Sequence, residues 1–253
     1  MSTIDFSPAP GAAPASTRIT RHAITEATLL VRNGEQLLLA LVIPLGILLG
    51  GRYFGGRFGD LDSLAPSVLG LAVWSSAFTS VAITTGFERR YGVLERLAAT
   101  PLGKAGLLAG KALAITVILL GQLVILVAAA LIIGWRPAFT VGSFFAAVLL
   151  VILASATFVC IGLLLAGLLR AEIILAVANL IYLVFLAAGG LLMPVDRYIP
   201  AVRPIVSVLP TGALGEGLRA AASGVVLGWP LIVLAIWLVV AGLLARRFFR
   251  WTS

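Results

Sequence analysis

The sequence predicts an all-α integral membrane protein in which six transmembrane helices follow an amphipathic interfacial helix. The first observation is the composition: 61% of the residues are hydrophobic and 11% are charged, against about 25% charged residues in an average soluble domain. The second is a mean hydropathy of +1.14, which leaves too little polar surface to cover a globule in water. The third is the presence of six apolar stretches that are candidates for membrane-spanning helices, each of which needs about 18 residues or more.

Two segments precede the first span. Residues 1–17 are rich in Pro, Ala and Ser and lack the basic and apolar regions of a signal peptide, so we expect a disordered tail. Residues 18–35 place Ile19, Ala23 and Ala27 at helical spacing, with basic and polar residues on the other side. A basic amphipathic helix directly ahead of a span is typical of a helix that lies in the membrane interface.

The remaining residues, 36–253, are expected to form a single membrane domain with six spans. The first span runs from residue 36 to residue 54 and contains Pro44. Its uncharged part has only 16 residues, so Glu35 and Arg52 are expected at the two membrane interfaces. Turns rich in Gly, Pro and charged residues separate the other spans. These five later spans are expected at residues 64–87, 112–133, 140–169, 173–192 and 227–245.

The basic residues are distributed unequally between the two sides of the membrane. In the six-span arrangement, twelve Lys and Arg residues lie on the side of the two termini and six lie on the other side. Because positive residues are enriched in cytoplasmic loops, both termini are expected in the cytoplasm. The net charge of +8 is spread over loops and helix ends, which disfavours nucleic acid as a partner and favours contact with anionic lipid headgroups.

One segment between the second and third spans is densely charged. Residues 87–111 hold seven of the 28 charged side chains of the protein. Within it, Gly92 allows a turn and Pro101 ends the short helix that follows. Three apolar side chains share one face of that helix: Val93, Leu94 and Leu97. The pattern fits a helix that docks into a groove of another protein, and it fits equally a charged loop that only stays out of the bilayer.

Several kinds of chemistry lack the residues that they need. The sequence has no G-x-x-x-x-G-K-[ST] stretch, so the chain itself is not expected to bind or hydrolyse ATP. No Asp, Glu or His is expected at mid-membrane, which disfavours an ion-driven carrier. The single cysteine, Cys160, and the single histidine, His22, exclude a cysteine-rich or multi-histidine metal centre. No constellation typical of an enzyme active site is visible either.

The charged segment also carries a family resemblance. "FERRYGVLERLAATPLGKAGLLAGK" resembles the E-R-x-x-G-T-L-E-x-L-x-x-T-P…K segment of the permease subunits of type-2 ATP-binding cassette (ABC) exporters. The matching residues are Glu88, Arg89, Gly92, Leu94, Glu95, Leu97, Thr100, Pro101 and Lys111. Val93 departs from the pattern, because threonine is usual at that position. The resemblance covers nearly the whole chain, including the interfacial helix, the six spans and a long external segment before the last span.

The resemblance implies further expectations. Residues 193–224 look like the family's external re-entrant pair of short helices. Residues 88–104 look like its coupling segment, in which residues 88–101, including Val93, contact a separate ATPase subunit together with the interfacial helix. The complex is expected to contain two such ATPase subunits, which bind ATP and Mg²⁺, and a second six-span permease, identical or homologous. Its cargo is expected to be a drug, a lipid or a glycolipid exported across the inner or plasma membrane.

Two further groups of residues are candidates for function within the spans. Hydroxyl groups recur at i, i+4 and i+8 on the second span beside two aromatic residues, and an amide lies in the fifth span. The candidate pathway residues are Trp74, Ser76, Phe78, Ser80, Thr84 and Asn179. The same hydroxyls would also suit close helix packing, through hydrogen bonds to their own helix backbone. Gly46 and Gly50 on the first span form a G-x-x-x-G pattern that permits close helix contact at a subunit interface.

Three functions remain open from the sequence. The preferred one is the transport subunit of an ATP-driven exporter, which forms the cargo pathway. A membrane anchoring or assembly subunit without its own transport path is an alternative, and an ion-driven secondary transporter is a further one. An ATPase gene beside this one would favour the first two functions. ATP-dependent movement of cargo by the reconstituted complex would separate those two from each other.

Overall fold

The computed structural model of the chain describes three stretches, residues 11–32, 34–54 and 60–249. All regular elements in these ranges are helices, which confirms the all-α class. The first helix, α1, covers Ala15–Arg32 and begins slightly before the expected start at residue 18. Most of the expected tail, residues 1–10, lies outside the described residues.

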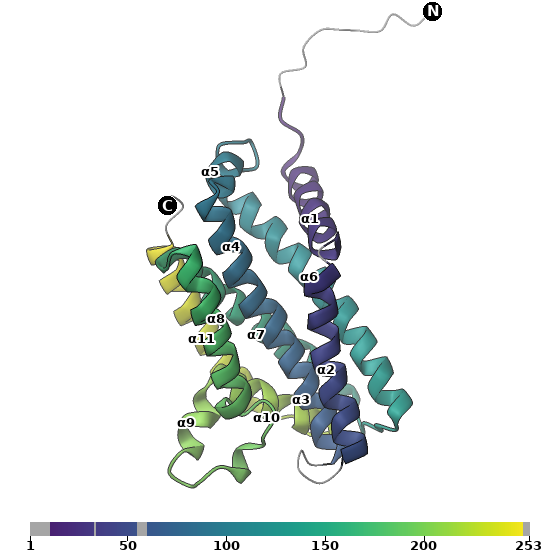
Figure 1. Cartoon of the computed structure of the whole chain (residues 1–253). Helices are drawn as coiled ribbons and strands as arrows, with labels where there is room; N and C mark the ends of the chain where they lie inside the picture. Colours follow the sequence, from purple (N-terminus) through teal and green to yellow (C-terminus); the bar gives the residue numbers. More distant parts are fainter. Residues whose placement is uncertain (1–10, 33, 55–59, 250–253) are drawn as a thin grey trace, which may run out of the picture.

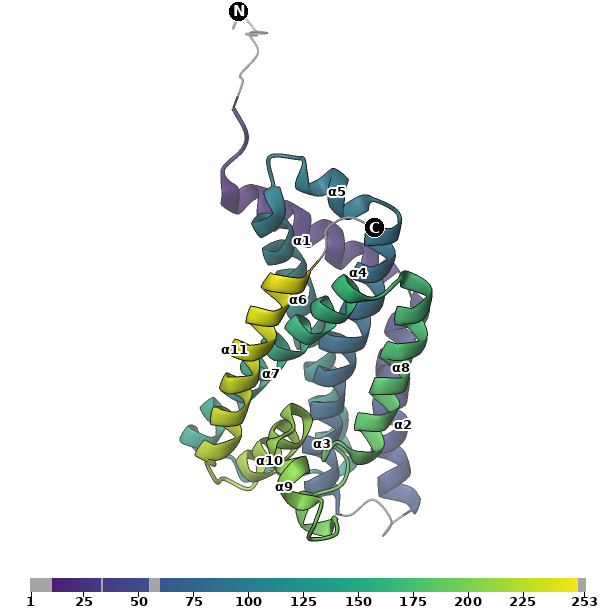
Figure 2. The same ribbon diagram turned by 90° about the vertical axis from the view of Figure 1, so that its left-hand side faces the viewer.

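The helices form an elongated bundle in which the long members run between two ends (Figure 1). At one end lie α1, the short helix α5 (Val93–Ala98) and the C-terminal end of α11 (Gly228–Phe248). At the opposite end lie the short helices α9 (Arg203–Val208) and α10 (Pro210–Ala222). The same division is visible after a 90° turn (Figure 2). We call these the α5 end and the α10 end of the bundle.

Five helices in the described part of the chain are long and apolar enough to cross a membrane. They are Leu61–Arg90, Gly103–Ile133, Val141–Leu168, Ala171–Ala188 and Gly228–Phe248, at the positions expected for the second to sixth spans. The expected first span corresponds to α2 (Gly34–Phe54), which is not among these five helices. α2 runs along the bundle beside the central helix (Figure 1), and the six-span arrangement stays a prediction.

The central helix of the bundle is Leu61–Arg90, which consists of α3 (Leu61–Trp74), the π-helical turn η1 (Ser75–Ser80) and α4 (Val81–Arg90). In its most apolar part 61% of the residues are buried inside the chain, against at most 28% in the other four long helices. It is enclosed because five helices pack against it: α2, α6 (Gly103–Ile133), α7 (Val141–Leu168), α8 (Ala171–Ala188) and α10. A π turn is rare inside a helix and changes the direction of the side chains that follow it.

Aromatic packing fixes the core on one side of the central helix. The rings of Trp74 and Phe78 are stacked with centroids 4.2 Å apart, and Phe158 from α7 (Val141–Leu168) meets Trp74 edge-on at 4.8 Å. Gly162 allows α7 to approach this closely, because a Cβ atom there would lie 2.9 Å from the Phe78 carbonyl oxygen. The core therefore occupies the α7 face of the central helix and leaves the opposite face for other contacts.

Two local signals delimit the helices on either side of the α6–α7 turn. α6 (Gly103–Ile133) ends at Gly134, whose φ of 110° lies in the left-handed region that glycine adopts most easily. α7 begins with a capping box between Thr140 and Ser143, in which each side chain hydrogen-bonds the other residue's backbone N–H, at 3.2 and 3.0 Å. The turn between these signals is short, and beyond it α6 packs mainly against α1 whereas α7 packs mainly against α11.

A hydrogen-bond network organises the segment between α8 (Ala171–Ala188) and α11. Arg219 on α10 donates to the carbonyl oxygens of Gly190 (2.9 Å) and Leu191 (2.8 Å), and to the hydroxyl of Ser67 on the central helix (2.8 Å). The Glu216 carboxylate pairs with Arg219 at 2.7 Å. This guanidinium satisfies backbone carbonyls just after α8 ends, which ties α10 to both the preceding loop and the central helix. Re-entrance of this segment into the membrane stays a prediction.

Candidate functional site

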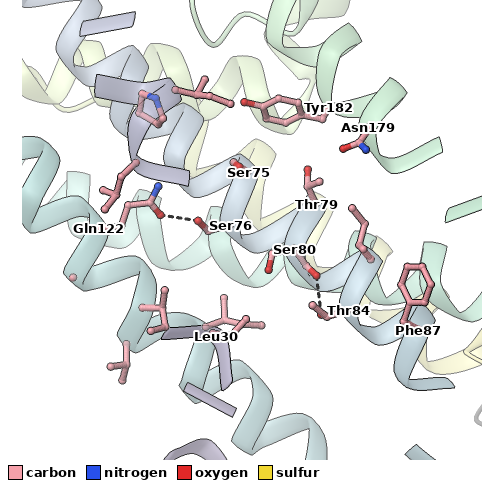
Figure 3. Close-up of a pocket in the computed structure, with 18 of the residues that line it drawn as sticks. Leu30, Ser75, Ser76, Thr79, Ser80, Thr84, Phe87, Gln122, Asn179 and Tyr182 are labelled. Carbon is pink, nitrogen blue, oxygen red and sulfur yellow. Dashed lines mark hydrogen bonds between the residues drawn. The ribbon is translucent and has the colours of Figure 1, made fainter. Parts of the chain in front are cut away.

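A cavity of about 930 Å³ lies on the face of the central helix that the aromatic core leaves free. Its walls come from α1, α2, the central helix, α6 and α8 (Figure 3). Tyr91 and Val93, beside the start of α5, also line it. Most of the lining is aliphatic or aromatic, from residues such as Ile83, Phe87, Ile118 and Tyr182. Cavities of this size and character are typical of small-molecule binding sites.

A row of hydroxyl groups on the central helix provides most of the polar lining (Figure 3). The row consists of Ser75, Ser76, Thr79, Ser80 and Thr84. Four of the five belong to the π turn η1, whose wider spacing brings consecutive pairs, Ser75-Ser76 and Thr79-Ser80, to the same face. The Ser76 hydroxyl donates to the Oε1 atom of Gln122 at 2.7 Å, and the Thr84 hydroxyl donates to the Ser80 carbonyl at 2.7 Å.

The structure divides the candidate pathway residues into two groups. Ser76, Ser80, Thr84 and Asn179 line the cavity. Trp74 and Phe78 do not line it: they are 2% and 0% exposed and form part of the aromatic core. The two groups differ in their contacts: the Trp74 ring packs against aromatic rings of α7 and α8, whereas the hydroxyls face the cavity. The use of the cavity as a cargo pathway is not shown by this arrangement.

Several cavity residues are absent from the predicted set, including the polar residues Gln122 and Tyr182. Gln122 lies within the third expected span, and its amide holds Ser76 across the cavity wall. The criterion that selected Asn179, an amide inside a span, applies equally to Gln122 and would have found it. Tyr182 lies one helical turn beyond Asn179 on α8 (Figure 3), and the spacing of these two residues is the only sequence signal for it.

A smaller recess of about 160 Å³ adjoins the cavity at the α5 end. The two share lining from Leu30, Ser80, Thr84, Glu88 and Ile115. Charged side chains from three helices meet in the recess: the Lys111 ammonium donates to Glu88 Oε1 at 2.7 Å and to Glu26 Oε2 at 3.0 Å. The Lys111 side chain is only 6% exposed, so both ion pairs are largely shielded from solvent and connect α1, the central helix and α6.

His22 borders this cluster on α1. Its Nε2 atom lies 3.8 Å from Glu26 Oε1, and its ring packs against α6 where Gly110 leaves room, because a Cβ atom at Gly110 would lie 2.6 Å from His22 Cδ2. Burial lowers the pKa of His22 below its usual value of 6.5, and the Glu26 carboxylate opposes this shift only in part. This shift favours the neutral form of His22 beside the cluster.

Arg89, the second residue of the expected coupling segment, points into the bundle. Its guanidinium donates to the carbonyl oxygens of Gly167 (2.6 Å) and Leu169 (2.5 Å) at the C-terminal end of α7. These carbonyls have no partner in their own helix, and a cation is favoured at the negative end of the helix dipole. The first two residues of the segment, Glu88 and Arg89, thus contact the chain itself.

The helix that the sequence predicts after Gly92 is present as α5, with a Gly92 φ of 66° at the turn. The apolar face does not point outward as a docking face requires: Leu94 is 1% exposed, and Val93 and Leu97 are half-buried. α5 packs against α4 and α6, and this contact takes up the apolar side chains. The outward surface instead presents Tyr91, Glu95, Arg96, Thr100 and Pro101.

Gly46 and Gly50 lie on α2, away from its contacts within the chain. A Cβ atom at either position would meet no described atom within 4 Å, so these glycines are not needed for packing inside the described chain. Their role at a subunit interface stays a prediction. In the described residues, no group of three or more His, Cys, Asp or Glu side chains is placed to hold a metal ion.

Five long apolar helices in the described residues, with a cavity among the packed helices, indicate a multi-pass membrane protein. The chain belongs to the ABC-2 type transporter family, whose model matches residues 22–222. The match runs from α1 to the end of α10 and confirms the family that the charged segment indicated. Comparison with curated proteins gave no match.

Proposed function

We propose that the chain is the membrane-spanning subunit of an ABC exporter, forms the cargo pathway, and is driven by a separate ATPase. The observation that carries this proposal is the path of the central helix. Its hydroxyl row lines the cavity, and the same helix ends at Arg90, directly before the α5 segment. One continuous element therefore connects a ligand-sized cavity with a charged segment at the bundle end, as a subunit driven from outside the membrane requires.

The proposed ATPase contact is the outward surface of α5 and its flanks, together with α1. Tyr91 is 61% exposed, and Glu95 and Arg96 place opposite charges beside it. Aromatic and arginine side chains are enriched in protein interfaces. Leu94 supports this surface from below and does not enter the interface. In the proposed complex two ATPase subunits bind ATP and Mg²⁺, and this end of the bundle faces the cytoplasm of a cell whose inner or plasma membrane holds the protein.

The proposed cargo is a hydrophobic or amphipathic molecule, such as a drug, a lipid or a glycolipid, moved outward. The mainly apolar walls of the cavity favour this class, because an apolar body loses contact with water there while the hydroxyl row binds polar groups. A second permease, identical or homologous, is proposed to pack on α2 at Gly46 and Gly50, where the surface is open.

The function is tested by reconstituting the purified chain with the ATPase encoded beside its gene. We expect ATP-dependent movement of a fluorescent amphiphile into or out of vesicles, and none with the chain alone. Binding of the ATPase without any transport would support the anchoring alternative instead. Transport driven by an ion gradient without ATP would support a secondary transporter.

The ATPase contact is tested by reversing one exposed charge. Glu95→Arg on α5 should weaken association with the ATPase at least tenfold, or about 1.4 kcal/mol, because like charges then meet across the interface. Asp196→Arg makes a similar change at an exposed position of the α10 end and should leave association unchanged. Both variants are compared by co-purification and by transport rate. Full association and full transport in Glu95→Arg would remove this surface from the interface.

A further inference from the structure

We infer that the cavity selects cargo with a cationic head: an alkylammonium or arylammonium group that seats against the Glu88 carboxylate, with an apolar body in the larger cavity. This inference rests on the proposed function only in assuming that the bound molecule is transported. The binding site itself is argued from charge, hydrogen bonding and shape.

The charge balance of the site is negative. Among the described residues that line the large cavity, Glu88 is the one with a charged side chain. In the adjoining recess, Glu26 and Glu88 share a single ammonium group, that of Lys111, which leaves one formal negative charge in excess. Among the described residues, Lys111 is the one basic side chain that lines the cavity or the recess. Arg89 is directed to the end of α7, and Arg18 lies two helical turns, about 12 Å, from Glu26 along α1.

One oxygen of Glu88 is available for a donor. Oε1 accepts from Lys111, whereas Oε2 is buried and has no hydrogen-bond partner in the described part of the chain. Buried carboxylate oxygens are nearly always hydrogen-bonded, because leaving them unpaired is costly. A carboxylate only accepts hydrogen bonds, so the missing partner is a donor. An ammonium group supplies both the donor and the compensating positive charge.

The surroundings of Glu88 suit the rest of such a molecule. Phe87 and Tyr91, which flank this part of the central helix, also line the cavity, and aromatic faces attract ammonium ions. Leu30 and Ile115 provide apolar contact where the cavity and the recess meet. The cavity has mainly apolar walls and adjoins a recess with excess negative charge, which matches the polarity of a cationic amphiphile and opposes that of an anionic one.

A second unpartnered polar atom lies farther along the cavity. The Thr79 hydroxyl is buried and has no hydrogen-bond partner among the described residues. Thr79 precedes Glu88 by nine positions in the sequence, which corresponds to about 13 Å along a helix axis. A ligand with an ammonium group at one end and a hydrogen-bonding group about that far away would satisfy both atoms at once.

The inference is tested by ligand binding to the full chain in nanodiscs of phosphatidylcholine, with empty nanodiscs as the blank. The probe is monodansylcadaverine, which joins a primary ammonium to a fluorescent apolar body. Its matched probes carry the same dansyl body with an uncharged alkyl chain or with a terminal carboxylate. We expect the ammonium probe to bind at least tenfold more tightly than the uncharged probe, and the carboxylate probe to bind least. Equal binding of all three would overturn the inference.

Variants assign the preference to the carboxylate. Glu88→Gln keeps the shape of the side chain and should reduce affinity for the ammonium probe about tenfold, with the uncharged probe unaffected; that retained binding also reports an intact cavity. Glu172→Gln is the matched control, because this carboxylate is 61% exposed and pairs with Arg90 outside the cavity. If Glu88→Gln does not fold, Glu26→Gln removes the same net charge from the recess and should act in the same direction.

An unchanged ammonium preference in a folded Glu88→Gln or Glu26→Gln protein would overturn the inference. The binding measurement needs neither ATP nor the ATPase, so its outcome is independent of the transport test. A chain that transports only uncharged amphiphiles keeps the proposed function and loses this inference. If the chain binds the ammonium probe at Glu88 but transports nothing, the cation-binding site is supported and the proposed transport function is not.

Discussion

Single residues of the family motif serve the structure of the chain itself. Arg89 is 8% exposed, and its guanidinium bonds two carbonyls at the end of α7. Arg89, a residue of the expected coupling segment, thus joins the central helix to α7, a helix far along the chain. A motif position identifies a residue that matters, but it does not say whether the contact is internal or belongs to a partner.

Replacing Arg89 by methionine should destabilise the protein. The variant keeps much of the apolar stem and removes two charge-assisted hydrogen bonds, each worth about 1.5–3 kcal/mol, so we expect a clear drop in the midpoint of thermal unfolding. Arg96→Met is the control, because the exposed guanidinium of Arg96 bonds only nearby carbonyls, those of Tyr91 and Gly92. Both midpoints are measured on detergent-purified chain. Equal midpoints for the two variants would contradict the internal role of Arg89.

The sequence predicts the chemistry of the cavity residues better than their directions. The hydroxyl row was recognised because its spacing follows a helix face, and four of the six candidate residues do line the cavity. Trp74 and Phe78 were grouped with them because they are neighbours in the sequence. Their direction depends on which face of the central helix α7 covers, and on a π turn that no local pattern announces.

At the scale of elements, α5 is the clearest case in which pattern and structure differ. A six-residue helix with an apolar face needs something to cover that face, and its own chain or a partner protein satisfies the pattern equally. In the structure α4 and α6 lie close enough to cover it. The decision depends on tertiary contacts, which the local sequence does not contain.

Truncation of Leu94 separates these two roles. Leu94→Ala removes a fully buried side chain, which typically costs about 2–5 kcal/mol, so it should loosen α5 from the bundle. We expect faster hydrogen exchange across α5 in the purified chain without any ATPase present. Ala99→Gly on the exposed side of the same segment is the control and should leave exchange elsewhere in α5 unchanged. Unaltered exchange in Leu94→Ala would return Leu94 to a docking role.

At the scale of the whole molecule, hydrophobicity alone locates most of the long helices. Five expected spans agree with helices of the described chain to within a few residues at most ends, because each apolar stretch has to be as long as the bilayer is thick. α6 begins well before its apolar stretch, at Gly103, because the charged segment itself continues as helix. Contacts between helices, including the cavity, follow from packing that periodicity does not determine.

The orientation of the bundle is tested by cysteine labelling in a Cys160→Ala background. Thr100→Cys at the α5 end should react with a membrane-impermeant maleimide only after cells are permeabilised. Ser223→Cys, exposed just after α10, should react in intact cells, because the basic residues favour a cytoplasmic α5 end. Labelling of Thr100→Cys in intact cells would reverse the topology.

The central helix joins the two ends of the bundle as one continuous element (Figure 1). Its 30 residues correspond to a length of about 45 Å. The Arg219 side chain hydrogen-bonds Ser67 near one end of the helix, and the Lys111 ammonium hydrogen-bonds Glu88 near the other end. We therefore expect a displacement of α5 to be transmitted along the central helix to the α10 end, unless the helix bends along its length. The π turn is the irregular part of this helix, and it lies between the two hydrogen-bonded contacts and beside the cavity. We expect that bending or twisting at the π turn would change the width of the cavity while the contacts at both ends are kept.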